Sequence, residues 1–222
     1  YNTRMEVAME EKNSREKIYA TAKEVFYAEG YIKGTIKKIA ERAQVPQGLV
    51  TYYFKTKDQL VSMILKDFYR SIQNRVDSYS ELNITNSLYR QIVVSHIYYE
   101  ILLSNENNCV FFKELRQKKH SNYEMLREVT DVVYWNYIED FNLSISKQEF
   151  DIFMVMQSAA RRDFFINYFE DRWKLSIPDI VNIIEAIVPR LFRIDQNVVD
   201  SCLFQGQNIV REINTEGICF LV

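Results

Sequence analysis

Residues 35–60 read TIKKIAERAQVPQGLVTYYFKTKDQL, and this stretch decides the fold of the chain. Thr35 is placed to cap a short helix, whose apolar residues recur at helical spacing as far as Ala43. Pro46 cannot sit inside a helix but suits its first turn, so a further helix is predicted from about Pro46 to Phe54. Two short helices joined by a tight turn are typical of a helix-turn-helix.

One helix is predicted on each side of this pair. Asn13 or Ser14 can cap the earlier helix, and Gly30 ends it, while residues 1–12 are expected to be flexible. Thr56 caps the later helix. Its apolar residues follow at four-residue intervals, namely Leu60, Ile64, Phe68, Ile72 and Val76.

Glycine and proline are nearly absent from the rest of the chain. Residues 49–205 contain no glycine and residues 47–177 contain no proline. Hairpins and strand-to-helix turns draw heavily on both residues. The sequence therefore predicts an all-α fold, with a three-helix domain over residues 13–62 and a larger helical domain over residues 63–222.

The composition is that of a globular protein without a membrane span. The 222 residues carry a net charge of −2, and charged residues interrupt every apolar run well short of the roughly 18 residues that cross a bilayer. No secretory signal is visible near the first residue. Cys109, Cys202 and Cys219 form neither a metal-binding pair nor an even disulfide framework. We expect a cytoplasmic protein.

Motifs for catalysis, cofactors and metals are missing from the sequence. There is no glycine-rich nucleotide loop and no HExxH or CxxC motif. His96 and His120 lie far apart, without Cys, Asp or Glu at metal-ligand spacing. Adjacent acidic pairs such as Glu139–Asp140 do not face one another on a helix. We expect no enzyme, no cofactor and no metal.

Positive charge gathers near the amino end. Residues 1–60 carry 11 basic and 8 acidic side chains, and between Lys33 and Lys57 six basic residues accompany only Glu41. A basic segment on a nearly neutral chain is the footprint that a DNA-contacting element leaves. The alternative is an ordinary solvated surface.

Residues 35–60, with the preceding Glu29-Gly30-Tyr31, resemble the DNA-binding domain of the TetR family of transcriptional regulators. The resemblance covers about residues 13–62. There are two departures, because Gln44 stands where the family usually has glycine and Thr51 where it often has an aromatic residue. They keep open an alternative interpretation, a helical interaction protein of the same fold that has lost specific DNA binding.

The resemblance implies that the third helix enters the major groove of DNA. Gln47 can pair bidentately with adenine, and Gly48 allows a close backbone approach. The candidates for base contacts are Lys37, Gln47, Gly48 and Thr51. The candidates for phosphate contacts, which set the register on the duplex, are Thr35, Tyr52, Tyr53 and Lys57.

In TetR-like proteins the larger domain binds a small ligand. Between Asn86 and Trp173 the chain has 17 aromatic residues in 88, which is compatible with a cavity lined by rings and with an uncharged hydrophobic or aromatic effector. The candidate wall residues are Tyr98, Leu102, Phe111, Phe112, Trp135, Ile138, Phe153, Met154, Gln157 and Phe164. Ordinary core packing is the alternative for each of them.

Arginines in this half allow two interpretations. Arg161 and Arg162 interrupt an apolar pattern, where one of them can pair with an acid across an interface or face a ligand carboxylate. The basic run Arg116–His120 is most simply a solvated loop between helices.

The resemblance also implies a homodimer. Helices over residues 147–169 and from about Pro178 to Leu191 are the candidates for self-association. The implied function is a ligand-responsive regulator, a repressor by default although an activator is not excluded. It binds palindromic operator DNA and is released by a small effector.

Overall fold

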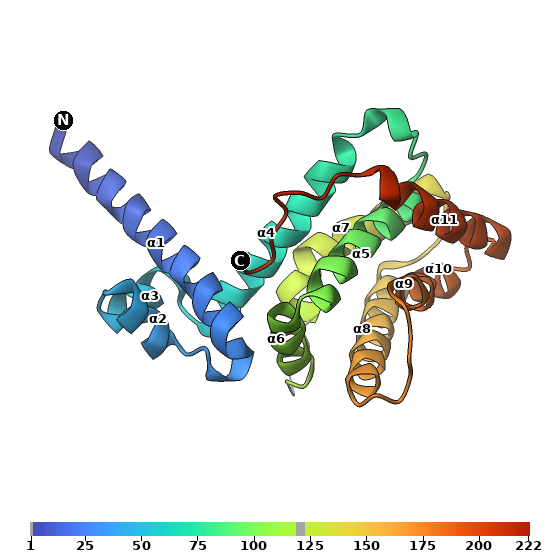
Figure 1. Cartoon of the computed structure of the whole chain (residues 1–222). Helices are drawn as coiled ribbons and strands as arrows, with labels where there is room; N and C mark the ends of the chain where they lie inside the picture. The colour runs from blue at the N-terminus through green and yellow to red at the C-terminus, as the bar shows by residue number, and fades with distance from the viewer. Residues whose placement is uncertain (1, 119–122) are drawn as a thin grey trace.

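The computed structural model describes residues 2–118 and 123–222, and this part of the chain is helical and contains no strand (Figure 1). The elements in chain order are α1 (Asn2–Lys33), α2 (Ile36–Ala43), α3 (Gln47–Phe54), α4 (Lys57–Asp77), η1 (Ser80–Leu82), α5 (Ser87–Ser104), α6 (Glu106–Arg116), α7 (Tyr123–Asp140), α8 (Lys147–Phe169), α9 (Ile177–Glu185), α10 (Ile187–Leu191), α11 (Gln196–Ile209) and η2 (Val210–Glu212). The predicted all-α fold is confirmed.

Side-chain caps fix the helices of the amino-terminal domain where the sequence predicts them. Thr35 Oγ1 accepts the backbone N–H of Lys38 at 3.3 Å, and Thr56 Oγ1 accepts that of Gln59 at 3.1 Å. Each cap satisfies one N–H that the helix leaves without a partner. α1, α2 and α3 then bury a shared apolar core, formed by Ile18, Ala22, Phe26, Ile39, Ala40, Val50 and Phe54.

One predicted boundary of this domain is wrong. α1 begins at Asn2, so Asn13 and Ser14 lie inside the helix and do not cap it. α3 runs from Gln47 to Phe54 with Pro46 at its N-cap, in agreement with the helix predicted from about Pro46 to Phe54. Gly30 interrupts the helical backbone of α1 as predicted, with φ of 75°.

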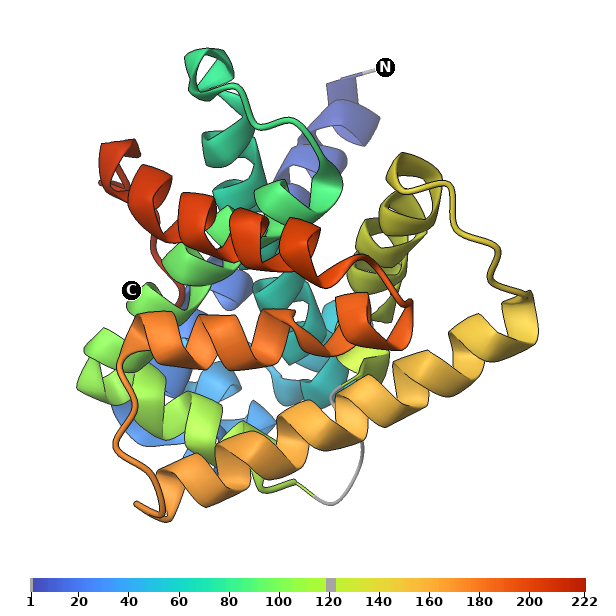
Figure 2. The same ribbon diagram turned by 90° about the vertical axis from the view of Figure 1, so that its right-hand side faces the viewer.

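α5 is the central helix of the larger domain. It packs against α4, α6, α7, α9 and α11, and residues 91–99 are all buried. α8, α9, α10 and α11 lie across the side of the molecule that faces the viewer in Figure 2. α4 runs from the amino-terminal domain into this body and so connects the two (Figure 1).

The close approach of α11 to α5 depends on Gly206. A Cβ atom at this position would lie 2.5 Å from Ile92 Cγ2, which is far inside van der Waals contact. We expect Gly206→Val to lower the free energy of unfolding by about 1–3 kcal/mol, because the packed core has no room for added methyl groups. Urea unfolding followed by circular dichroism checks this, and an unchanged midpoint would contradict the packing.

Residues 213–222 return from η2 along α4 towards the amino-terminal domain (Figure 1). The Phe220 ring is buried, with its centroid 5.0 Å from that of Phe68 on α4 and 5.6 Å from that of Phe111 on α6. Phe111 in turn lies 5.4 Å from Phe26 on α1. A continuous set of aromatic rings therefore joins α1, α6 and α4.

Among the described residues, no helix combines the length and the apolar character that a bilayer crossing needs.

Candidate nucleic-acid interface and internal cavity

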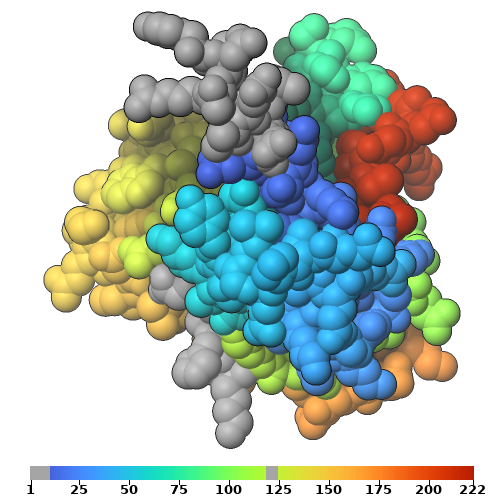
Figure 3. Space-filling model, turned by 90° about the vertical axis from the view of Figure 1, so that its left-hand side faces the viewer, coloured from blue at the N-terminus to red at the C-terminus, as the bar shows by residue number. Residues whose placement is uncertain are grey.

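α2 and α3 form an outward face at the amino-terminal end of the molecule (light blue to cyan in Figure 3). Six of the eight residues predicted to contact DNA are exposed on or beside these helices, namely Thr35, Lys37, Gln47, Gly48, Thr51 and Tyr52. Val50 and Phe54 point inward and hold α3 on the domain core. The helix therefore presents one side to solvent.

The start of α3 is open and unobstructed. A Cβ atom on Gly48 would meet no other atom within 4 Å, so packing within the protein does not require glycine there. The Thr51 hydroxyl donates to the Gly48 carbonyl at 3.0 Å, which leaves its oxygen lone pairs and methyl group facing outward. Gln44 adopts the left-handed conformation with φ of 56°, so the turn before α3 forms without glycine.

Lys57 is partly buried and its ammonium group contacts the end of α1, so its role as a phosphate contact stays a prediction. Its ammonium donates to the carbonyl of Tyr31 and lies 4.1 Å from the centroid of the Tyr31 ring. Burial lowers the pKa of Lys57. Tyr53 is half-buried, with its ring 6.3 Å from that of Phe54. Lys57 thus ties α4 to the end of α1.

Ion pairs moderate the positive charge near α2. Lys37 Nζ lies 3.8 Å from Glu41 Oε1, and both side chains are largely exposed. Exposed pairs of this kind are weak in water, so Lys37 can exchange its partner for a phosphate. Lys38 pairs with Glu29 on α1.

An internal cavity of about 80 Å³ lies in the larger domain, lined by residues of α4, α5, α6, α7, α8 and α9 and partly open to solvent. Four tyrosines line it, namely Tyr69, Tyr98, Tyr99 and Tyr134. Burial raises the pKa of all four phenols, so each stays protonated at neutral pH and can donate a hydrogen bond.

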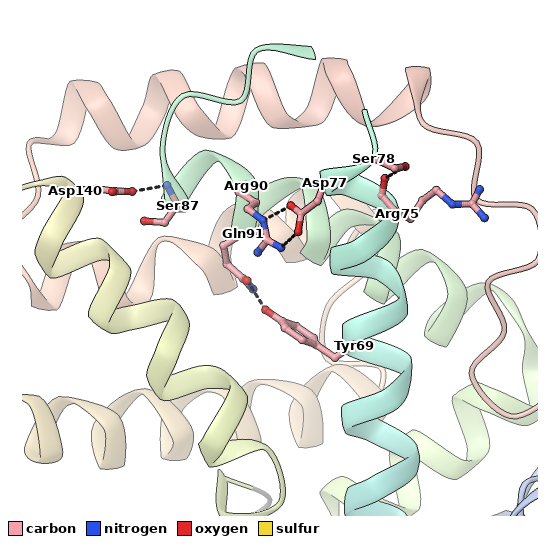
Figure 4. A network of polar contacts seen from close by, with 8 residues as sticks. All are labelled: Tyr69, Arg75, Asp77, Ser78, Ser87, Arg90, Gln91 and Asp140. Atoms are coloured by element: carbon pink, nitrogen blue, oxygen red, sulfur yellow. Dashed lines mark hydrogen bonds and ion pairs between the residues drawn. The ribbon is translucent and has the colours of Figure 1, made fainter. Parts of the chain in front are cut away.

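A buried chain of hydrogen bonds follows the cavity wall. The Tyr69 hydroxyl on α4 donates to Gln91 on α5, the contact seen in Figure 4. The Gln91 amide donates to Ser95 Oγ at 2.9 Å, and the Ser95 hydroxyl donates to Glu185 on α9 at 2.9 Å. Each group donates to the next, and the chain of hydrogen bonds ends at the Glu185 carboxylate. Hydrogen bonds linked in this way strengthen one another.

Arg161 on α8 completes this chain. Its Nη1 and Nη2 atoms lie 3.0 Å and 3.2 Å from the two Glu185 carboxylate oxygens. Burial alone lowers the pKa of Arg161, but the Glu185 carboxylate overrides this and raises it well above its ordinary value. Arg161 thus pairs with an acid of its own chain, whereas the sequence pattern predicts such a pair across an interface.

Arg116 also lies in the cavity wall, so its prediction as part of a solvated loop is wrong. It is the last residue of α6. Lys118, two residues on, pairs with Asp58 at the start of α4. His120, from the same basic run, lies outside the described residues.

Only two of the ten predicted wall residues, Tyr98 and Gln157, line this cavity. The other eight are elsewhere, namely Leu102, Phe111, Phe112 and Met154 fully buried in the core, and Trp135, Ile138, Phe153 and Phe164 partly exposed. Aromatic density indicates apolar core in general and does not locate a hollow. Gln91 and Ser95, which are polar residues inside an otherwise apolar helix, indicate the position of the cavity better than the aromatic residues do.

α6 touches both the cavity and the amino-terminal domain. Two residues before Arg116, the Glu114 carboxylate accepts the backbone N–H of Ile32 at 2.7 Å, just beyond the break at Gly30. Asp58 accepts a hydrogen bond from the Tyr31 hydroxyl at 2.7 Å and pairs with Lys118. Movement of the end of α6 would therefore move or break direct contacts with α1 and α4.

Comparison with known proteins agrees with this architecture. Residues 18–64 match the sequence model of a family described as "Bacterial regulatory proteins, tetR family". The structure of RolR in complex with resorcinol is 13% identical, with a TM-score of 0.58 over 90% of this chain and 95% of RolR. TylP, a TetR regulator from Streptomyces fradiae, is 15% identical, with a TM-score of 0.48 over 86% of this chain and 90% of TylP. No curated protein matches the sequence.

Proposed function

We propose that the chain is a TetR family transcriptional regulator, which binds palindromic operator DNA as a homodimer in the cytoplasm and is released by a small effector. Repression relieved by the effector is the direction we propose. The observation that carries DNA binding is the exposed start of α3, where Gln47, Gly48 and Thr51 face solvent. A helix presented in this way fits the major groove.

An exposed apolar stripe on α8 supports the homodimer. Ile152, Val155 and Met156 are 48%, 64% and 50% exposed, and Ala159 continues the stripe at helical spacing. A second copy that packs its own α8 on this stripe would bury both, as a two-fold interface requires. On α9, Ile180 and Ile184 are buried inside the subunit, whereas Ile183 is 43% exposed and can contribute to the same interface.

We infer release by an effector from the spacing that DNA binding requires of a dimer. A dimer must hold its two α3 helices about 34–36 Å apart to enter successive major grooves. A ligand in the cavity favours whichever arrangement of α6 and α4 suits it, and α6 contacts α1 through Glu114. If the ligand binds the dimer state that does not fit DNA more tightly than the state that does, DNA affinity falls. The size of the fall is set by the ratio of the ligand's affinities for these two states. The small aromatic ligand of RolR supports an effector of similar size.

The function is tested by gel shift of purified protein against a library of genomic fragments at two salt concentrations. We expect a small set of fragments to be retained, with weaker binding at higher salt because phosphate contacts release counterions. Retention of no fragment above non-specific background would instead support an interaction protein that has lost specific DNA binding.

Gly48→Ala should separate stability from DNA binding. Nothing within 4 Å opposes the added methyl group, so we expect the free energy of unfolding to rise by up to about 1 kcal/mol. The same methyl group should weaken operator binding, because it holds the helix backbone away from the groove floor. Thermal melting and fluorescence anisotropy measure the two effects. Unchanged operator affinity would remove Gly48 from the interface.

A further inference from the structure

The internal cavity contains a guanidinium group that no carboxylate of the described chain neutralises. The charged residues that line the cavity are Arg116, Arg161 and Glu185. Arg161 and Glu185 satisfy each other through two hydrogen bonds. Arg116 remains, and within the described residues it has no ion-pair partner. Arg116 is partly buried, and a charge that is partly removed from water without a partner carries a cost that a ligand of opposite charge would reduce.

Aromatic rings hold Arg116 in place. Its Cζ atom lies 4.6 Å from the centroid of the Phe112 ring and 5.5 Å from that of Phe165. A guanidinium is planar, and its N–H groups match the two oxygens of a carboxylate, so ring contacts that restrict its position favour this match. Burial lowers the pKa of Arg116, yet an arginine remains charged in proteins.

Three polar atoms at the cavity lack hydrogen-bond partners in the described chain. They are Nε of Arg116, Nε of Arg161 and Oε1 of Gln157, and all three are buried. Such orphans are rare in folded proteins. Two of the three are donors, and the protonated phenols of Tyr98 and Tyr134 add further donors. The cavity therefore offers positive charge and hydrogen-bond donors to an acceptor-rich ligand.

The size and walls of the cavity limit the ligand. Its volume is about 80 Å³, whereas an engineered protein cavity of about 150 Å³ accommodates benzene. Because the cavity is partly open to solvent, we expect a small ligand with a body of about one ring or less. Leu126, Val133 and the tyrosine rings provide apolar surface for its body.

We propose that the cavity binds a small organic monocarboxylate, whose oxygens accept hydrogen bonds from Arg116 and whose apolar part packs on the tyrosine rings. This ligand class replaces the uncharged effector expected from the sequence. The proposal rests on the effector-responsive function above and specifies the chemistry of the effector.

The test uses the full chain in buffer free of chloride and phosphate. Acetate, butyrate and benzoate are the acids, and benzamide and resorcinol are neutral probes of comparable size. Thermal melting and titration calorimetry compare the wild type with Arg116→Met and Arg116→Lys. Lys113→Gln, which removes another cation of α6 outside the cavity, is the matched control.

We expect at least one acid to raise the melting temperature of the wild type and of Lys113→Gln, and benzamide to have no effect. Arg116→Met should weaken binding of that acid about 10- to 100-fold, because it removes charge-assisted hydrogen bonds. Without ligand, this variant should melt at or above the wild-type temperature, since it removes an unpaired, partly buried charge. Arg116→Lys, which keeps the charge but loses the planar fork, should bind with intermediate affinity.

Three results would overturn the proposal. They are equal stabilisation by benzamide or resorcinol, an undiminished response to acid in Arg116→Met, and no response to any of the three acids. Operator affinity is measured in the same samples. An acid that binds through Arg116 but leaves operator affinity unchanged would support the acid site and contradict the effector-responsive function.

Discussion

Glu185→Gln is expected to lower the free energy of unfolding by about 3–5 kcal/mol, because it removes the negative partner of a buried guanidinium. Glu185 is 1% exposed, and it neutralises Arg161 while accepting a hydrogen bond from Ser95. The substitution keeps the side-chain shape but leaves Arg161 without its negative partner, in a cavity wall that already contains Arg116, unpaired within the described chain. Equilibrium unfolding in urea measures the loss.

Two variants control this experiment. Glu170→Gln breaks the exposed pair of Glu170 with Arg172, which lie 3.2 Å apart, and should change stability by less than about 1 kcal/mol. The double variant Arg161→Met/Glu185→Leu removes both charges of the buried pair and should recover most of the stability lost in Glu185→Gln. A loss below about 1 kcal/mol in Glu185→Gln would show that the pair does not hold α8 to α9.

Ile152→Asp combined with Met156→Asp should convert the protein to a monomer and weaken operator binding by about 10²- to 10⁴-fold, because a monomer loses the gain in effective concentration that links two half-sites. Charges on the α8 stripe would have to be buried without partners in a dimer. Both side chains are about half exposed within the subunit, so the fold itself should persist. Analytical ultracentrifugation and fluorescence anisotropy measure the two effects.

Val110→Asp is the matched control for the α8 variant. Val110 is 43% exposed on α6, away from the stripe, and its replacement should leave both the dimer and operator affinity unchanged. A double α8 variant that remains dimeric would place the subunit interface on another face of the molecule.

The helices of the amino-terminal domain could be predicted because their signals are local. Thr35 and Thr56 cap the helices that immediately follow them, and the buried residues of α4 recur every four positions. The start of α1 could not be predicted in this way. Residues 2–12 carry no regular apolar stripe, and so nothing in their pattern indicates that α1 extends to Asn2.

The cavity and the carboxyl-terminal segment depend on contacts between distant residues. In the sequence, Arg116 resembles part of a basic loop. In the structure it ends α6, which packs against α5 and α8. Phe220 follows no periodic pattern, yet it fills the space between α4 and α6. Lys57 resembles a phosphate contact in sequence, but in the structure its ammonium group donates to the carbonyl of Tyr31 and lies over the Tyr31 ring. Local pattern identifies helices, whereas tertiary packing decides which polar residues are free.

Footprinting of a retained operator fragment with the wild type and Gln47→Ala tests DNA reading by α3 most directly. We predict a protected palindrome whose half-sites are read by two copies of α3, one helical turn of DNA or a multiple of it apart. Gln47→Ala should relax preference at the same base pair in both half-sites, with a cost of about 1–3 kcal/mol for each. Protection without two-fold symmetry, or base preference unaltered by Gln47→Ala, would contradict this role of α3.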